Sequence, residues 1–117
     1  MPSEKRMFGD RAEALAEAFF HARSYRVLAR NFLTRYGELD LVIEREGRIH
    51  VIEVKARASR MQSPYETITQ KKRLHLSRAF ELWLQRHPGY QDYAYQFDAF
   101  FLWREGTEWK TEWLEGI

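Results

Sequence analysis

The chain of 117 residues contains no cysteine. This absence excludes disulfide bridges and metal sites built from thiolates, and it is typical of a reducing compartment. Long apolar runs are also missing, and the run at residues 99–103 is far too short to span a membrane. The N-terminal segment carries acids among its apolar residues and lacks the apolar core of a signal peptide. We therefore expect a cytoplasmic protein without a membrane partner.

The sequence has little excess of charge of either sign, because the formal net charge is only +2. Its distribution is uneven, since residues 55–78 carry seven basic side chains against the single acid Glu66, whereas acids dominate from Asp98 onward. The basic residues of this segment are Lys55, Arg57, Arg60, Lys71, Lys72, Arg73 and Arg78. A solvated helix face accounts for any one of them, but less well for the cluster. The segment therefore indicates a polyanionic partner.

The sequence from Gly37 to Arg57 predicts two β-strands joined by a short connection that contains Gly47. Strand side chains alternate between faces, so Glu53 and Lys55 share a face, about 7 Å apart along the strand. The hairpin can place Asp40 beside them. One alternative is a solvent-facing ion pair on a sheet covered on one side. The apolar density of both strands instead favours a sheet covered on both faces.

Two carboxylates and an ammonium on such a hairpin suit phosphodiester chemistry. Mg²⁺ takes carboxylate oxygens and keeps water and phosphate as its other ligands. A metal held by Asp40 and Glu53 would polarise a phosphodiester and lower the pKa of a bound water. Lys55 would orient that water or balance the developing charge.

Two helices flank this region in the sequence. The first is predicted to open at Phe8-Gly9-Asp10 with Asp10 as N-cap, after a loose leader at residues 1–7. Glu13 is then either a capping partner, which the spacing favours, or a third acid over the sheet. The second helix is expected from Tyr65 to Arg86, with Lys72 on its apolar stripe. Basic residues in its first turn oppose the helix dipole, which fits an anion bound there.

Further strands are predicted at residues 25–32, 93–103 and 108–114. The order helix, three strands, helix, two strands predicts one α/β domain with a mixed central sheet, a helix on each face and a C-terminal β-hairpin. Trp109 and Trp113 share a strand face and are either core, a dimer surface or a base-stacking platform. The four histidines lack metal-ligand spacing, so we interpret them as structural or surface residues.

This order, the early Glu13, Asp40 on the second strand and Glu53-Val54-Lys55 on the third together resemble the PD-(D/E)XK nuclease superfamily. Within it the chain is similar, over about residues 8–103, to the YraN-like family of uncharacterised bacterial proteins. The matching residues are Asn31, Gly37-Glu38-Leu39-Asp40-Leu41, Val51-Ile52-Glu53-Val54-Lys55, Arg57, Lys71 or Lys72, and Phe97-Asp98. The chain departs from the family pattern at Leu39, which replaces the proline of the superfamily's name, at Gln96, and in the glycine-free loop at residues 62–64.

The resemblance implies a restriction-endonuclease-like αβββαβ core. It implies that Asp40 and Glu53 bind Mg²⁺ or Mn²⁺, that Lys55 is the catalytic lysine, and that Glu13 is an auxiliary ligand, as in archaeal Holliday-junction resolvases. Gln70 corresponds to a polar helix residue that many superfamily members add.

The sequence therefore predicts a metal-dependent nuclease acting on DNA phosphodiesters, including branched or flapped DNA. The expected nucleic-acid contacts are Arg57, Arg60, Gln70, Lys71, Lys72 and Arg73. The alternative is a catalytically inactive nucleic-acid-binding or protein-interaction module on the same fold. Symmetric cleavage of a junction would require a homodimer, for which Trp109 and Trp113 offer a surface.

Overall fold

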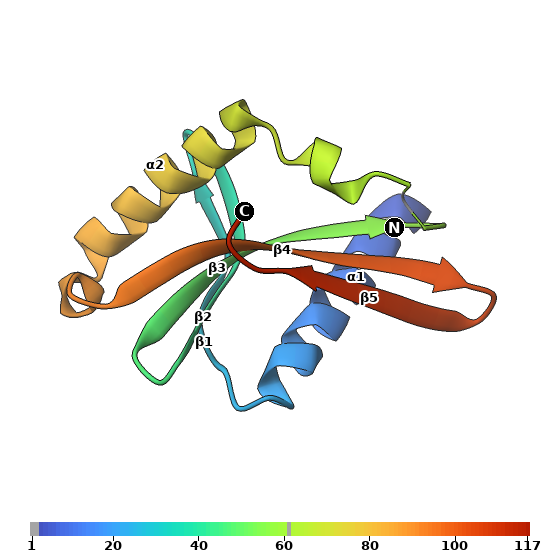
Figure 1. Cartoon of the computed structure of the whole chain (residues 1–117), viewed down its shortest axis with the longest axis horizontal. Helices are drawn as coiled ribbons and strands as arrows, with labels where there is room; N and C mark the ends of the chain where they lie inside the picture. Colours follow the sequence, from blue (N-terminus) through green and yellow to red (C-terminus); the bar gives the residue numbers. More distant parts are fainter. Residues whose placement is uncertain (1–2, 61) are drawn as a thin grey trace.

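A five-stranded sheet with one long helix on each face forms the body of the protein (Figure 1). The computed structural model describes residues 3–60 and 62–117. In chain order the elements are α1 (Glu4–His21), β1 (Arg26–Thr34), β2 (Gly37–Arg45), β3 (Arg48–Arg57), the 3₁₀ turn η1 (Pro64–Thr67), α2 (Gln70–Arg86), the 3₁₀ turn η2 (Pro88–Tyr90), β4 (Ala94–Glu105) and β5 (Glu108–Leu114).

The strands lie in the order β1-β2-β3-β4-β5, and the β3–β4 pair is parallel while the others are antiparallel. A parallel pair needs a crossover, which α2 supplies. The β2–β3 turn consists of Glu46 and Gly47, whose φ angles of 54° and 80° give the paired left-handed conformations that a two-residue hairpin prefers. The predicted mixed sheet and C-terminal hairpin are therefore confirmed.

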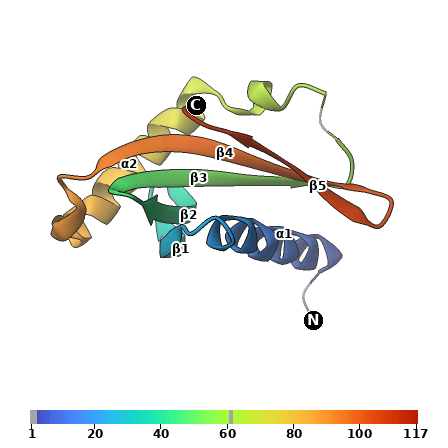
Figure 2. The same ribbon diagram turned by 60° about the horizontal axis from the view of Figure 1, so that its bottom comes forward.

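Apolar side chains cover both faces of the sheet. Figure 2 shows α1 and α2 on opposite sides of β3 and β4. Ala12, Ala16 and Phe20 of α1 pack on one face, against a layer that includes Ile52. On the other face α2 packs against a layer that includes Val51. Neighbouring residues of β3 thus serve opposite cores, as strand alternation requires. The predicted helix on each face is confirmed, and neither described helix has the length and hydropathy to cross a lipid bilayer.

The start of α1 differs from the prediction. The helix begins at Glu4, and the Ser3 hydroxyl oxygen accepts a hydrogen bond from the Arg6 amide at 3.1 Å, so Ser3 is the N-cap. The proposal of an Asp10 cap and a loose leader is therefore wrong for residues 4–7, whereas residues 1–2 lie outside the described part. Gly9 is tolerated inside the helix because its cost is small. Asp10 and Glu13 consequently lie within α1, and Glu13 is not a capping residue.

The second helix begins later than predicted. Residues 64–67 form the separate turn η1, and α2 starts at Gln70 after Thr69, whose hydroxyl accepts from the Lys72 amide at 3.1 Å. The break lets Ile68 pack with Ala99 and Phe101 on the sheet. It also places the basic residues in the first turn of α2, as expected.

The aromatic side chains of β5 pack inward. Trp109 lies against Phe8, with ring centroids 4.9 Å apart, and Trp113 lies against Phe20 at 5.1 Å. Both tryptophans border the core layer under α1. This packing supports their interpretation as core residues over that of a stacking platform.

Candidate functional site

The polar centre of the sheet lies where β2 and β3 stop pairing. Their backbone register runs from Arg45–Arg48 to Leu41–Ile52. One residue further, the Asp40 Oδ2 atom accepts a hydrogen bond from the Val54 amide at 2.8 Å. The Asp40 side chain thus takes the place of a backbone carbonyl as the hydrogen-bond acceptor for a β3 amide. The backbone pairing of the two strands ends here, and the Asp40 and Glu53 carboxylates lie at this break in the middle of the sheet.

The pKa of the Asp40 carboxyl group lies near neutral pH. Burial, followed by the charges of Glu53, Glu13 and Glu38, raises its pKa to about 7, although the Val54 hydrogen bond opposes this shift. A bound cation would favour the ionised form of such a group, so cation binding at Asp40 would release a proton near pH 7.

Glu53 is a buried carboxylate with one free oxygen. The residue is 5 % exposed. Its Oε1 atom lies 2.8 Å from the Lys72 Nζ atom and 3.8 Å from the Lys55 Nζ atom. Its Oε2 atom is buried and has no hydrogen-bond partner among the described residues. A buried unpaired carboxylate oxygen is costly, and a metal ligand position would explain it.

Lys55 lies beside Glu53 as the strand spacing predicted. Its ammonium is nevertheless the more distant of the two that face this carboxylate. The nearer ammonium belongs to Lys72 of α2, the helix that packs on this face of the sheet. The sequence placed Lys72 on the inner stripe of α2 but did not pair it with Glu53, because that contact depends on how α2 crosses the sheet.

Asn31 and Glu38 join the site, although the sequence assigned them no role. Asn31 falls in the register between the pairs Arg30–Leu41 and Phe32–Leu39, opposite Asp40, and has a left-handed φ of 52°. With the side-chain amide turned so that its nitrogen faces the two acids, that nitrogen donates to Glu13 Oε2 at 3.0 Å and to Glu38 Oε1 at 2.9 Å. Asparagine adopts the left-handed conformation more readily than most residues, which is the local signal that could have identified it. Burial and the Glu38 charge raise the pKa of Glu13.

A pocket of about 260 Å³ opens between α1 and the strands β1 and β2. Its polar lining residues are Asp10, Glu13, Glu17, Arg30, Asn31 and Asp40. The Arg30 guanidinium is held by the Glu17 carboxylate, so the remaining acids dominate the electrostatics. Such a pocket favours a cation. The second predicted reading of Glu13, as an acid over the sheet, is the one that the structure supports.

The pocket and Glu53 approach Asp40 from different sides. Glu13 and Asn31 lie toward α1, whereas Glu53 shares the strand face of Val51 and pairs with Lys72 of α2. Asp40 lies between them, where the strands part. The carboxylates therefore surround a gap in the sheet instead of lining one wall of a cleft.

The remaining predicted nucleic-acid contacts are spread around this gap. Gln70, Lys71 and Arg73 are exposed in the first turn of α2, next to Lys72. Arg57 is exposed at the end of β3. The Arg60 guanidinium instead lies 5.7 Å from the centroid of the Trp103 ring. The α2 residues thus adjoin Lys72, which contacts Glu53, whereas Arg60 lies against Trp103 of β4.

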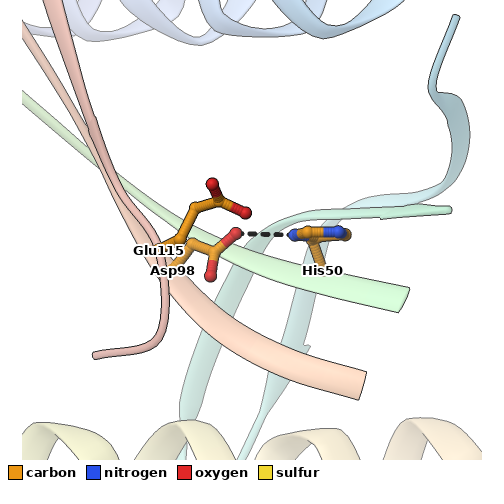
Figure 3. A group of neighbouring side chains, drawn as sticks. All are labelled: His50, Asp98 and Glu115. Atoms are coloured by element: carbon orange, nitrogen blue, oxygen red, sulfur yellow. Dashed lines mark hydrogen bonds and ion pairs between the residues drawn. The ribbon is translucent and has the colours of Figure 1, made fainter. Parts of the chain in front are cut away.

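A second polar cluster consists of the buried His50 and Asp98 and the exposed Glu115 (Figure 3). Within residues 3–60 and 62–117 it is the one group of three histidine or acidic residues whose possible ligand atoms lie within 4.8 Å of one another. Asp98 Oδ2 accepts from the His50 Nδ1 atom at 2.7 Å and Trp113 at 3.0 Å. Its Oδ1 atom accepts from Gln96 and the Gly116 amide, both at 2.9 Å.

These four donors saturate the Asp98 carboxylate, so the cluster fits a structural anchor better than a metal site. Burial by itself raises the pKa of Asp98, but the hydrogen bonds, led by that from His50, bring it below its ordinary value. Gln96 also donates to Glu115 at 3.3 Å. The Gln96 departure therefore belongs to this anchor and not to the surroundings of Asp40, and the contact with Asp98 supports the structural interpretation of His50.

Comparisons with known proteins place the chain among uncharacterised relatives. The profile of the uncharacterised protein family UPF0102 matches residues 12–102. A UPF0102 protein of Nitrobacter winogradskyi is 38% identical over 91 residues, which cover 78% of this chain and 76% of the relative. UPF0102 proteins of Rhodopseudomonas palustris strains BisB18 and BisA53 are 41% and 40% identical over 91 residues, which cover 78% of this chain and 67% and 69% of those relatives. The matched range contains Glu13, Asn31, Asp40, Glu53, Lys55 and Lys72. The chain therefore belongs to the uncharacterised protein family UPF0102, the YraN-like family that its sequence resembles.

Proposed function

We propose that this protein is a metal-dependent nuclease acting on DNA phosphodiesters, with branched or flapped DNA as substrates. The observation that carries the proposal is the pair of carboxylates at the β2–β3 gap. The pKa of Asp40 is raised to about 7, and Glu53 has a buried oxygen without a hydrogen-bond partner in residues 3–60 and 62–117, with the Lys55 ammonium 3.8 Å from its other oxygen. Buried acids of this kind are expensive for stability and are typical of functional sites. The resemblance to PD-(D/E)XK nucleases supports the same reading.

The donor set fits Mg²⁺ or Mn²⁺, which prefer oxygen ligands. Asp40 and Glu53 would hold the ion, and Glu13, which Asn31 contacts, would act as an auxiliary ligand. A metal ion there supplies a Lewis acid and an acidified water. Lys55 would orient the attacking water and balance the charge that develops on phosphorus oxygens. Lys71, Arg73, Gln70 and Arg57 would contact flanking phosphates, which positions the scissile bond without reading sequence.

The first experiment is calorimetric titration with Mn²⁺ of the natural protein and of the double variant Asp40→Ala/Glu53→Ala. We expect saturable binding by the former and its loss in the latter. A matched control, Glu81→Ala/Asp92→Ala, removes two exposed acids outside the site and should bind Mn²⁺ normally. Binding that persists without Asp40 and Glu53 would refute the assignment of the ligands.

Cleavage is the second readout. Four-way junction and flap DNA are incubated with Mn²⁺ and the natural protein, Asp40→Ala or Lys55→Ala. We expect products from the natural protein and a loss of at least about 10²-fold in either variant, because each removes a group that acts on the reacting atoms. Undiminished cleavage by Lys55→Ala would contradict the role of Lys55.

One observation favours the non-catalytic alternative. Lys72 already balances the charge of Glu53 at 2.8 Å, so the site is a stable ion pair without any metal. A DNA-binding module would show salt-dependent affinity that is independent of metal and survives Asp40→Ala. The two functions are therefore separated by the same set of variants.

A further inference from the structure

Two ammonium groups share one oxygen of Glu53. The Lys72 Nζ atom is 2.8 Å from Glu53 Oε1, and the Lys55 Nζ atom is 3.8 Å from it. Glu53 Oε2 is buried, in a side chain that is 6% exposed, and has no hydrogen-bond partner in the part of the chain that the structure describes. Both ammonium groups therefore lie on the side of the other oxygen.

The position of Lys72 would allow its ammonium to leave the Glu53 carboxylate as well as to bind it. Its side chain is 35% exposed, compared with 20% for Lys55, so it reaches Glu53 from the solvent side. It sits in the first turn of α2, where the helix dipole disfavours a cation. Its four-carbon stem is flexible, so the ammonium can swing outward without moving the helix. Lys55, by contrast, is fixed to the strand that carries Glu53.

A divalent ion and Lys72 would compete for the same carboxylate. Two cations a few ångströms apart repel strongly where water is scarce. Removal of Lys72 from the metal-free protein would, in turn, leave a buried carboxylate without its nearest counter-charge. The Lys72–Glu53 ion pair would thus stabilise the metal-free protein and oppose the binding of a divalent ion.

We propose that Lys72 is a displaceable counter-ion of Glu53, which occupies the carboxylate in the metal-free protein and is released toward the first turn of α2 when a divalent cation binds. The inference rests on the proposed metal site and adds a regulatory role to it. The released ammonium joins Lys71 and Arg73, so bound metal strengthens the attraction for phosphate there. By linkage, phosphate at α2 strengthens metal binding to the same degree.

The test compares Lys72→Met and Lys72→Arg with the natural protein in Mn²⁺ calorimetry. Methionine keeps the stem and removes the competing charge, so we expect Mn²⁺ affinity to rise at least about fivefold. Arginine can hold both carboxylate oxygens at once, so affinity should fall below that of the natural protein. The control Lys110→Met breaks an exposed pair with Glu108, 3.1 Å apart, and should leave Mn²⁺ affinity unchanged.

Thermal unfolding with a chelator tests the metal-free half of the inference. Lys72→Met should unfold about 5 °C or more below the natural protein, and Mn²⁺ should restore more of its stability than it adds to the natural protein. The Lys110→Met control should show neither effect. If Lys72→Met is too unstable to purify, the reduced Mn²⁺ affinity of Lys72→Arg still decides the matter.

The outcomes separate the inference from the proposed function. Equal or weaker Mn²⁺ binding by Lys72→Met overturns the counter-ion role, even if the natural protein cleaves DNA. Tighter binding by Lys72→Met supports the role, and an absence of cleavage would then count against the nuclease alone. Failure of every variant to bind Mn²⁺ overturns both.

Discussion

The carboxyl group of Asp40 would make folding and the proposed metal binding oppose each other within one residue. Its ionised form is the one that a cation needs, yet burial and the Glu53 charge favour the protonated form and raise its pKa to about 7. The folded protein therefore holds this proton more tightly than the unfolded chain does. Stability is lost as the pH rises between about 4 and 7 and is constant with respect to this group above that window.

Asp40→Asn should consequently stabilise the metal-free protein. The amide oxygen can still accept the Val54 hydrogen bond, while the buried charge is gone. We expect a gain on the order of 2–3 kcal/mol in the free energy of unfolding at pH 8, which shrinks as the pH is lowered to 5. Urea unfolding in the presence of a chelator measures it. The exposed Asp92→Asn should show no such pH-dependent gain, and an Asp40→Asn protein no more stable at pH 8 would contradict the raised pKa.

The same proton should appear in metal binding. Below about pH 7 Mn²⁺ must displace it from Asp40, so we expect the apparent affinity to fall by about tenfold for each unit of pH. Calorimetry in two buffers with different ionisation enthalpies counts the released protons directly. A pH-independent affinity between 5.5 and 7 would show that Asp40 is not the titrating ligand.

Among individual residues, Asp40, Glu53 and Lys55 could be placed together from the sequence. Strand alternation and a two-residue turn fix the register of a hairpin, so nothing beyond local pattern was needed. The Lys72 contact and the Asn31 bridge were not predictable in this way. Each joins the hairpin to a separate element, and tertiary packing sets such contacts.

At the scale of elements, the start of α1 decides what Glu13 does. A helix that opened at Asp10 would use Glu13 as a capping partner, whereas the observed start at Glu4 leaves Glu13 free to face Asn31 and the pocket. The sequence misled here because Asp10 and Glu13 satisfy a capping pattern after Gly9. Ser3 offers a weaker signal, because Arg6 stands three residues on in place of an acid and the charged residues that follow resemble a solvated leader.

The two alternatives differ in which residue stabilises the helix. Ser3→Ala should lower the free energy of unfolding by about 1 kcal/mol, because the Arg6 amide loses its acceptor. Asp10→Ala should cost much less, since this side chain caps nothing. Urea unfolding of both variants at pH 7 decides between the two helix starts. A larger loss from Asp10→Ala would place the helix start where the sequence pattern put it.

For the molecule as a whole, the Asp98 cluster ties distant parts of the chain together. One carboxylate on β4 binds β3 through His50, β5 through Trp113 and the C-terminal segment through the Gly116 amide. The adjacent Ile117 amide donates to the Phe97 carbonyl at 2.8 Å. No periodic pattern predicts this convergence, which arises only when the sheet is assembled.

Asp98→Asn should therefore cost about 3 kcal/mol of stability, because an amide cannot accept from four donors. The lowered pKa of Asp98 adds a pH dependence of the usual acidic kind. The contribution of this group is fully present above its unfolded pKa and is lost as the pH falls through its lower folded pKa. Urea unfolding from pH 7 to pH 3 measures both effects. The exposed Glu115→Gln is the control and should cost little, and an equal loss from it would show that Asp98 is not the hub.

The hydrogen bond from Val54 to Asp40 gives the protein a natural reporter of the state of the Asp40 carboxyl group. This amide donates its hydrogen bond to an ionisable side chain, so its electronic environment should change when Asp40 gains a proton or a cation. In a ¹⁵N-labelled sample the Val54 cross-peak should shift with pH around 7 and should move again on titration with a diamagnetic ion such as Mg²⁺. A single backbone resonance would then read the occupancy of the centre without a dye, a substrate or a mutation.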